Sequence, residues 1–186
     1  MTFENSWVLH LNSWGLKHHG LISFTADTLV YVVLALAALL ILRDALKISP
    51  LKGGLSKFLR TLVLDGLINF IVPLGAAIVL SEILSKVINR DRPFVALPGV
   101  HLVIPHSADG GMPSHHVLFM VAVATSIYLR NKSAGLVLAA LALISGVARI
   151  AAGIHYPSDI VVGALIGWVM VIIYRRILPT AIKSLV

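Results

Sequence analysis

The sequence has no cysteine among its 186 residues. This absence excludes disulfide bonds, a thiol nucleophile and cysteine-ligated metal sites, and it leaves the redox compartment open. Charged residues are also scarce, at 12%, whereas a soluble domain carries about a quarter. Aspartate and glutamate together number only 8. So few charges cannot cover a surface that faces water on all sides, and an ordinary soluble domain is excluded.

Apolar residues make up the chain instead, with 58% hydrophobic residues and a mean hydropathy of +0.95. The apolar runs are continuous and do not alternate, which favours transmembrane helices over a β-barrel. The predicted fold class is therefore all-α, an integral membrane helical bundle. No linker, low-complexity stretch or internal repeat divides residues 1–186, so we expect a single domain. The first residues lack the basic region of a cleaved signal peptide.

The hydropathy pattern predicts about five membrane spans, which we place at residues 21–42, 61–84, 113–129, 133–149 and 157–174. The second span carries Asp65, Asn69 and Glu82, which a helix facing only lipid would not tolerate, so it should face the bundle interior. Residues 1–20 mix tryptophan, lysine and histidine with apolar neighbours. This composition predicts an amphipathic helix lying in the membrane interface, which gives six helices in all.

Five spans would place residues 1–20, the 85–112 loop and the 149–157 turn on one face of the membrane. The opposite face would hold ten of the fifteen Lys and Arg residues, and the positive-inside rule makes that face cytoplasmic. The formal net charge of +7 is thereby explained by cytoplasmic loops and anionic lipid, and no nucleic-acid partner is expected. In a bacterial plasma membrane, the first face would be periplasmic or extracellular.

Two basic and polar segments lie on that first face. Arg90-Asp91-Arg92-Pro93 precedes the third span, which opens with Pro113-Ser114-His115-His116. Arginine forms forked hydrogen bonds with phosphate oxygens, and a helix that starts at Pro113 would point free backbone N–H groups at an anion. Taken singly, either segment is equally well explained as a turn or a solvated loop.

A third segment returns to the same face and carries Arg149, His155 and Asp159. The four-residue spacing lets the Asp159 carboxylate hold the His155 imidazole in one tautomer, as a nucleophile toward phosphorus, while Arg149 neutralises the phosphate charge. The alternative is a His–Asp pair that caps a helix. His116 would then be a general acid opposite the nucleophile. The remaining histidines are expected to be interfacial or loop residues, namely His10, His18, His19, His101 and His106.

These segments resemble the motifs of the type 2 phosphatidic acid phosphatases, a superfamily of metal-independent membrane lipid phosphatases that shares its fold with the vanadium haloperoxidases. Arg149, His155 and Asp159 match every charged position of the third motif, with Ala148 in place of its serine. Residues 113–116 match the second motif, with His115 where glycine is usual. Arg92-Pro93 matches the end of the first motif.

The first motif departs from the family at its lysine. Ser85 stands at the lysine position, seven residues before Arg92, and Lys86 lies one place late, so Lys86 or Arg90 would have to substitute. The resemblance implies that His155, oriented by Asp159, forms a phosphohistidine and that His116 protonates the leaving group. It also implies a metal-free phosphate site, without a cofactor, made by Arg92, Arg149 and the Ser114 amide region with Lys86, Arg90 and His115 beside them.

The expected substrate is a polyprenyl or glycerolipid phosphate in the lipid bilayer. The outward-facing site, and the small size with an interfacial N-terminal segment, resemble the bacitracin-resistance type of undecaprenyl pyrophosphate phosphatase, which serves cell wall biosynthesis. A phosphatidylglycerophosphate phosphatase or a broad-specificity lipid phosphatase is the next alternative, followed by a lipid A phosphatase. A small transporter or channel lined by Asp65, Glu82, Arg149 and Asp159 also remains open, as does a catalytically inactive homologue.

Overall fold

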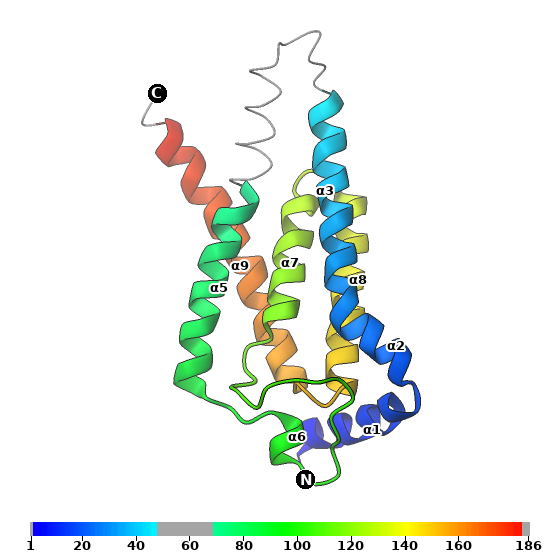
Figure 1. The fold of residues 1–186 in the computed structure, drawn as a ribbon. Helices are drawn as coiled ribbons and strands as arrows, with labels where there is room; N and C mark the ends of the chain where they lie inside the picture. The colour runs from blue at the N-terminus through cyan, green and yellow to red at the C-terminus, as the bar shows by residue number, and fades with distance from the viewer. Residues whose placement is uncertain (1, 48–68, 184–186) are drawn as a thin grey trace.

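The computed structural model describes residues 2–47 and 69–183, and within these ranges every regular element is helical (Figure 1). The predicted all-helical fold class is confirmed. The order along the chain is α1 (Phe3–Lys17), α2 (His19–Ser23), a π-helical turn η1 (Phe24–Thr28), α3 (Leu29–Lys47), α5 (Asn69–Ile88), the single turn α6 (Pro93–Ala96), α7 (His115–Tyr128), α8 (Lys132–Ala151) and α9 (Pro157–Lys183).

Helices α3, α5, α7, α8 and α9 run side by side, with α7 between the others (Figure 1). Most of α7 is buried, and Gly163 and Gly167 of α9 lie against its backbone, where a Cβ atom would collide. Small residues are the usual means by which membrane helices approach closely. Large apolar side chains on the outer helices, such as Leu39 and Leu143, are exposed as lipid-facing residues would be.

The predicted count of five spans is not confirmed. Four helical stretches are long and apolar enough to cross a membrane, at His19–Asp44, Phe70–Ala96, Lys132–Ala151 and Pro157–Ile177. The central helix α7 has 14 residues and is shorter than a span requires. The second predicted span begins at 61, but residues 61–68, with Asp65, lie outside the described ranges. Its helix ends at Ile88 and not at 84.

The ends of the helices divide as the sequence predicted. Helix α1, α6, the loop before α7 and the α8–α9 turn lie at one end of the bundle, and the α7–α8 turn and the last residues of α9 lie at the other (Figure 1). Helix α1 crosses the first end and packs against α8 through Val8, Asn12 and Gly15, while Trp7 and Phe3 stay exposed. One face of α1 is thus part of the protein core.

Candidate active site

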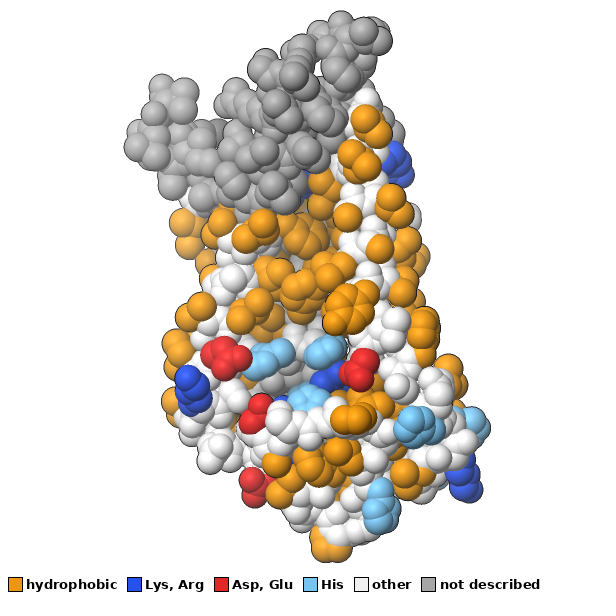
Figure 2. Space-filling view, in the orientation of Figure 1, with side chains coloured by type: hydrophobic (Ala, Val, Ile, Leu, Met, Phe, Trp, Pro, Cys, Tyr) orange, Lys and Arg blue, Asp and Glu red, His pale blue; other side chains and the backbone are white. Residues whose placement is uncertain are grey.

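Polar and charged side chains gather at the α1 end of the bundle, around a hollow whose upper walls are apolar (Figure 2). Five of the predicted site residues are almost completely buried there, namely Arg92, Ser114, Arg149, His155 and Asp159. Buried charges are costly unless they are paired or bind a ligand. Such a concentration of buried arginine and histidine is therefore a candidate anion site.

The α8–α9 turn brings Arg149 and His155 to the same place. Arg149 lies in the last turn of α8 and Asp159 in the first turn of α9. Between them Gly153 has a φ of 80°, and a Cβ atom there would lie 2.9 Å from the carbonyl oxygen of His101. Only glycine fits this left-handed and crowded position. The turn thus determines how Arg149 and His155 lie relative to each other in space.

Asp159 lies beside His155 as its spacing predicted, but the contact is loose. The His155 Nδ1 to Asp159 Oδ2 distance is 3.5 Å, and the pair lacks hydrogen-bond geometry, so no hydrogen bond from Nδ1 to this carboxylate fixes the imidazole in this structure. The firm contacts of Asp159 are elsewhere. Its Oδ2 accepts the Tyr156 N–H at 2.7 Å, and its Oδ1 accepts a hydrogen bond from Arg90 at 3.0 Å.

Arg90 lies behind Asp159 and is engaged with carboxylates. Its NH2 group donates to Glu4 at 2.8 Å, its NH1 group also donates to Ser158, and the guanidinium lies 3.8 Å from the centre of the Tyr156 ring. Glu4 also accepts the Ser158 N–H at 2.7 Å. We expected Arg90 as a possible phosphate ligand, and in the structure its hydrogen bonds go to Glu4, Ser158 and Asp159. Helix α1 supplies the acid that compensates it.

Arg92 is held by the loop that precedes α7. Its guanidinium donates to Asp109 Oδ1 at 2.9 Å and 3.2 Å and to the Ile154 carbonyl at 3.1 Å. Partial burial works to raise the pKa of Asp109, but the hydrogen bonds from Arg92 and Ser107 outweigh it, so the pKa is lowered. Asp109 is therefore ionised at neutral pH and ties the loop to Arg92.

Arg149 contacts residues whose role the sequence did not reveal. Its NH1 group donates to the Ala26 carbonyl at 3.1 Å and approaches Asp27 Oδ1 at 3.4 Å, and its NH2 group donates to His106 Nε2 at 3.3 Å. His106 lies in a loop, as the sequence predicted, but its contact with Arg149 was not expected. Local sequence carries no signal for this contact, because His106 lies 43 residues before Arg149.

His155 is surrounded by positive charge. Burial, with Arg149, Arg92 and His106 nearby, lowers the pKa of His155 well below its usual value. Its ring meets that of His106 edge to face, with centroids 6.5 Å apart. The imidazole is therefore neutral at physiological pH and retains a lone pair, which is the state a nucleophile needs.

The start of α7 differs from the prediction. The helix begins at His115, with Ser114 as its N-cap and Pro113 outside it. The reason is a tertiary hydrogen bond: the Ser114 N–H donates to the Asp159 carbonyl at 3.1 Å and holds Ser114 extended. This amide is consequently not free for phosphate. In the part of the chain that the structure describes, the buried Ser114 hydroxyl has no hydrogen-bond partner.

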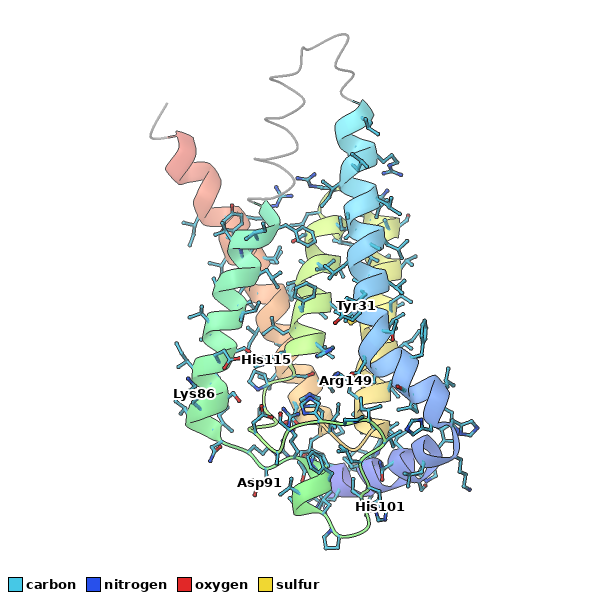
Figure 3. The ribbon with its side chains drawn as sticks, viewed as in Figure 1. Tyr31, Lys86, Asp91, His101, His115 and Arg149 are labelled. Atoms are coloured by element: carbon cyan, nitrogen blue, oxygen red, sulfur yellow. The ribbon has the colours of Figure 1, made fainter. Side chains whose placement is uncertain are left out.

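His115 and His116 open onto an apolar cavity. Its volume is about 340 Å³, and it lies between α3, α5 and α7, lined also by Val30, Tyr31, Leu34, Ile78 and Phe119. The His115 Nε2 atom lies 3.7 Å from Glu82 Oε1 at the margin of the site. Figure 3 labels Tyr31 and His115, which line this cavity, and Arg149, which lies near His116. The polar site and an apolar space are therefore adjacent.

The structure shows the effect of the lysine standing one residue later than in the family motif. Ser85, at the lysine position of the family motif, turns inward and its hydroxyl donates to the Gly110 carbonyl at 3.4 Å. Lys86 is exposed at the outer edge of α5 (Figure 3). Among the described residues no hydrogen bond or ion pair joins Lys86 to the site. Within the same ranges, no group of three or more His, Cys, Asp or Glu side chains has an arrangement that could hold a metal ion.

These features define a class: a helical membrane protein with buried arginine, histidine and aspartate side chains at one end of its bundle, which form a candidate anion site. The PAP2 superfamily model matches residues 66–183, and the chain belongs to that superfamily. The family resemblance identified in the sequence is thereby confirmed, as is, at the level of the family, the expectation of a PAP2-type phosphatase.

Individual relatives agree with this assignment. The chain is 34% identical over 108 residues to the bacitracin transport permease protein BcrC of Bacillus licheniformis, covering 58% of this chain and 51% of that protein. It is 38% identical over 91 residues to the undecaprenyl-diphosphatase BcrC of Bacillus subtilis (strain 168), covering 49% and 46%. The chain thus spans about half the length of these curated relatives.

A solved structure shares the fold. The crystal structure of Aquifex aeolicus LpxE superimposes with a TM-score of 0.58 and 25% sequence identity, over 84% of this chain and 93% of that chain. The similarity therefore extends to nearly the whole bundle of that protein, including segments outside residues 66–183. The likeness of fold is therefore not limited to residues 66–183, which carry the family motifs.

Proposed function

We propose that the protein is a membrane lipid phosphatase that hydrolyses undecaprenyl diphosphate to undecaprenyl phosphate, and that residues 1–186 act as one phosphatase domain. The observation that carries the proposal is the apolar cavity that ends at His115 and His116, beside the buried arginines. A phosphate bound at Arg92 and Arg149 would have its lipid chain in an apolar space open to the bilayer. The names of the BcrC relatives support the choice of a polyprenyl diphosphate.

The first chemical step is attack on phosphorus. His155 Nε2 forms a bond to the terminal phosphorus, and the bond from that phosphorus to the bridging oxygen breaks. Arg92 and Arg149 stabilise the charge on the phosphoryl oxygens. His116 gives its proton to the departing oxygen of the lipid monophosphate. Asp159 stabilises the positive charge that develops on the imidazole, and Arg90 and the Tyr156 N–H hold the carboxylate for that purpose.

The second step regenerates the enzyme. His116, now deprotonated, accepts a proton from water as the water oxygen attacks the phosphohistidine. The nitrogen–phosphorus bond breaks, inorganic phosphate leaves, and His155 returns to its neutral state. The low pKa of His155 favours this return, because burial and the nearby arginines disfavour a charged imidazole. The sequence of steps needs no cofactor.

The other substrates differ in the lipid and not in the chemistry. A phosphatidylglycerophosphate, another lipid monophosphate or a lipid A phosphate would present the same phosphoryl group to the same arginines. A transport function is less well supported, because the described residues proposed for a path, Glu82, Arg149 and Asp159, all belong to the candidate site at the α1 end of the bundle. Glu82 lies beside His115, and Arg149 beside Asp27, while Asp65 lies outside the described residues.

The proposed location is the plasma membrane of a bacterium, with the active site on the periplasmic or extracellular face. Arg130, Lys132, Arg175 and Arg176 belong to the opposite end of the bundle, which supports a cytoplasmic position for that end. Used carrier lipid diphosphate would then reach the site from the outer leaflet. The lipid substrate and the bilayer are the proposed partners, and none of these features calls for nucleic acid.

The deciding experiment is phosphate release by the purified protein in detergent with a metal chelator. We expect release from farnesyl diphosphate, and faster release from undecaprenyl diphosphate than from phosphatidylglycerophosphate. His155→Ala is the matched inactive control. If the wild-type protein releases no more phosphate than His155→Ala from any of these lipids, the proposed function is wrong. A preference for phosphatidylglycerophosphate would instead replace the proposed substrate.

A further inference from the structure

His106 occupies a fixed position at the site, although it lies in a loop without regular structure. Before it, the Asn12 side chain bonds both to the His101 N–H at 2.9 Å and to the His101 carbonyl at 2.8 Å, and Val103 donates to the Ala152 carbonyl at 3.2 Å. After it, Asp109 is bound by Arg92. The loop is thus held on both sides of His106 by contacts with α1, the α8–α9 turn and Arg92.

The chemistry of its neighbours fixes the tautomer of His106. The Ser107 carbonyl, 3.1 Å from Nδ1, can only accept, so Nδ1 carries the hydrogen. The Arg149 NH2 group can only donate, so Nε2 offers its lone pair at 3.3 Å. Burial, with Arg92 and Arg149 nearby, lowers the pKa of His106, although the Ser107 carbonyl and Asp109 oppose this, and the neutral acceptor form is therefore favoured.

The NH1 group of Arg149 contacts the continuous helical stretch formed by α2, η1 and α3. The π-helical turn Phe24–Thr28 interrupts an otherwise α-helical stretch and carries both the Ala26 carbonyl and the Asp27 carboxylate, which receive Arg149 NH1. π-Helical turns are rare and are found mainly at functional sites, because they reorient backbone groups. Here the turn directs two acceptors at one arginine.

One nitrogen of Arg149 then remains. Nε is buried and, among the described residues, has no hydrogen-bond partner, although the side chain is only 1% exposed. A buried N–H of a charged group without an acceptor is unfavourable by itself, and a bound anion would satisfy it. The Nε position is therefore where a phosphate oxygen would complete the site.

We propose that His106 and the π-helical turn at Ala26–Asp27 form a clamp that orients the Arg149 guanidinium and leaves its Nε–H to bind the substrate phosphate. This inference rests on the proposed function. His106 and Asp27 are positioning residues, since they act on the phosphate through Arg149. The clamp joins the segment before α3 and the loop before α7 to the end of α8. Three distant parts of the chain therefore determine the orientation of the Arg149 guanidinium.

The test compares two side chains of similar size at position 106. Glutamine places an amide oxygen near the position of the imidazole Nε2, whereas methionine fills the space without an effective acceptor. We expect His106→Gln to bind inorganic phosphate within about threefold of wild type and His106→Met about tenfold more weakly, because hydrogen bonds to charged groups have that effect on affinity. Isothermal titration calorimetry of the full protein in detergent measures the binding.

Controls separate the clamp from loop packing and from the function itself. His101→Ala alters an exposed histidine of the same loop and should leave phosphate affinity unchanged. Asp27→Ala should weaken phosphate binding in the same direction as His106→Met. If His106→Met binds phosphate as wild type does, or if His106→Gln is as weak as His106→Met, the clamp is wrong. If wild type itself binds no phosphate, the clamp is wrong, whereas the proposed function is decided separately by phosphate release from the lipid.

Discussion

Glu4, in the first turn of α1, accepts a hydrogen bond at 2.8 Å from the guanidinium of Arg90, 86 residues further along the chain. The same guanidinium reaches Asp159 at 3.0 Å. Glu4 lies outside residues 66–183, the part of the chain that the PAP2 model matches. A carboxylate beyond the family motifs therefore supports the acid that faces His155.

This relationship predicts the effect of Glu4→Gln. Without the Glu4 charge, Arg90 is compensated by Asp159 alone and draws that carboxylate away from His155. We expect kcat to fall by about tenfold, since hydrogen bonds between charged groups have about that effect. Asp91→Asn, which removes an exposed acid from the same end of the bundle, is the control. Steady-state kinetics with equal loss in both variants would argue for a general charge effect instead.

The two histidines of the proposed mechanism should differ in a trapping experiment. His155→Ala should form no phosphoenzyme with any substrate, because the attacking nitrogen is gone. His116→Ala should still form it from an aryl phosphate, whose leaving group needs no proton, while its turnover of lipid diphosphate falls by about 10²–10⁴. Rapid quenching with radiolabelled substrate measures both. A phosphoenzyme that persists in His155→Ala would remove that residue from its role.

The outward position of Lys86 makes a prediction about the family lysine. Lys86→Ala should change kcat/KM by less than about threefold, since an exposed charge beyond hydrogen-bond reach acts only weakly. Arg92→Ala should lower kcat/KM by about a hundredfold or more, because a buried guanidinium that binds phosphate is lost. The comparison uses the same substrate at low and high salt. Equal damage from the two changes would mean that Lys86 reaches the phosphate during turnover.

The contribution of His155 to the acid side of the pH–activity profile follows from its pKa. This pKa is lowered by burial and by the positive charges of Arg149 and Arg92, so His155 loses its proton at a lower pH than a free histidine. The value of kcat/KM reports the free enzyme. We expect it to remain on its plateau through about pH 6.5, the usual histidine pKa, and to decline only at lower pH. An acid limb centred at or above that pH would contradict the inferred electrostatics.

Local spacing in the sequence predicted which side chains of the candidate site would lie together. The positions of Arg149, His155 and Asp159 follow from a helix end and a turn, which sequence reports well. Glu4, Asp27 and His106 reach the site only through tertiary packing, over separations of 43 residues or more. A lone histidine or acid in an interfacial segment has no periodicity or motif that could identify such a contact.

The boundaries of the elements show the same limit. Pro113 is suited to a first helical position, yet α7 begins at His115, because a hydrogen bond to the distant Asp159 carbonyl holds Ser114 extended. Helix α5 continues past the predicted residue 84 to Ile88, which decides that Ser85 faces the Gly110 loop while Lys86 faces outward. Local propensity could not choose between these registers.

The orientation of the protein in the membrane decides whether the active site meets lipid of the outer or of the inner leaflet. Cysteine labelling can test this orientation without background, because the chain has no cysteine. His101 is exposed in the loop at the active-site end, and Ser133 is exposed at the start of α8, at the opposite end. Neither side chain belongs to the proposed catalytic machinery. The variants His101→Cys and Ser133→Cys therefore report the two faces of the membrane.

We expect the cysteine at position 101 to react with an impermeant maleimide in intact cells, and the cysteine at position 133 to react only after the membrane is opened. The reason is the distribution of charge: ten of the fifteen Lys and Arg residues belong to segments assigned to the Ser133 side, and such clusters in short loops are seldom translocated. The reverse labelling pattern would put the active site in the cytoplasm. Recycling of undecaprenyl diphosphate from the outer leaflet would then lose its support, and a phosphatase of lipid synthesis inside the cell would replace it.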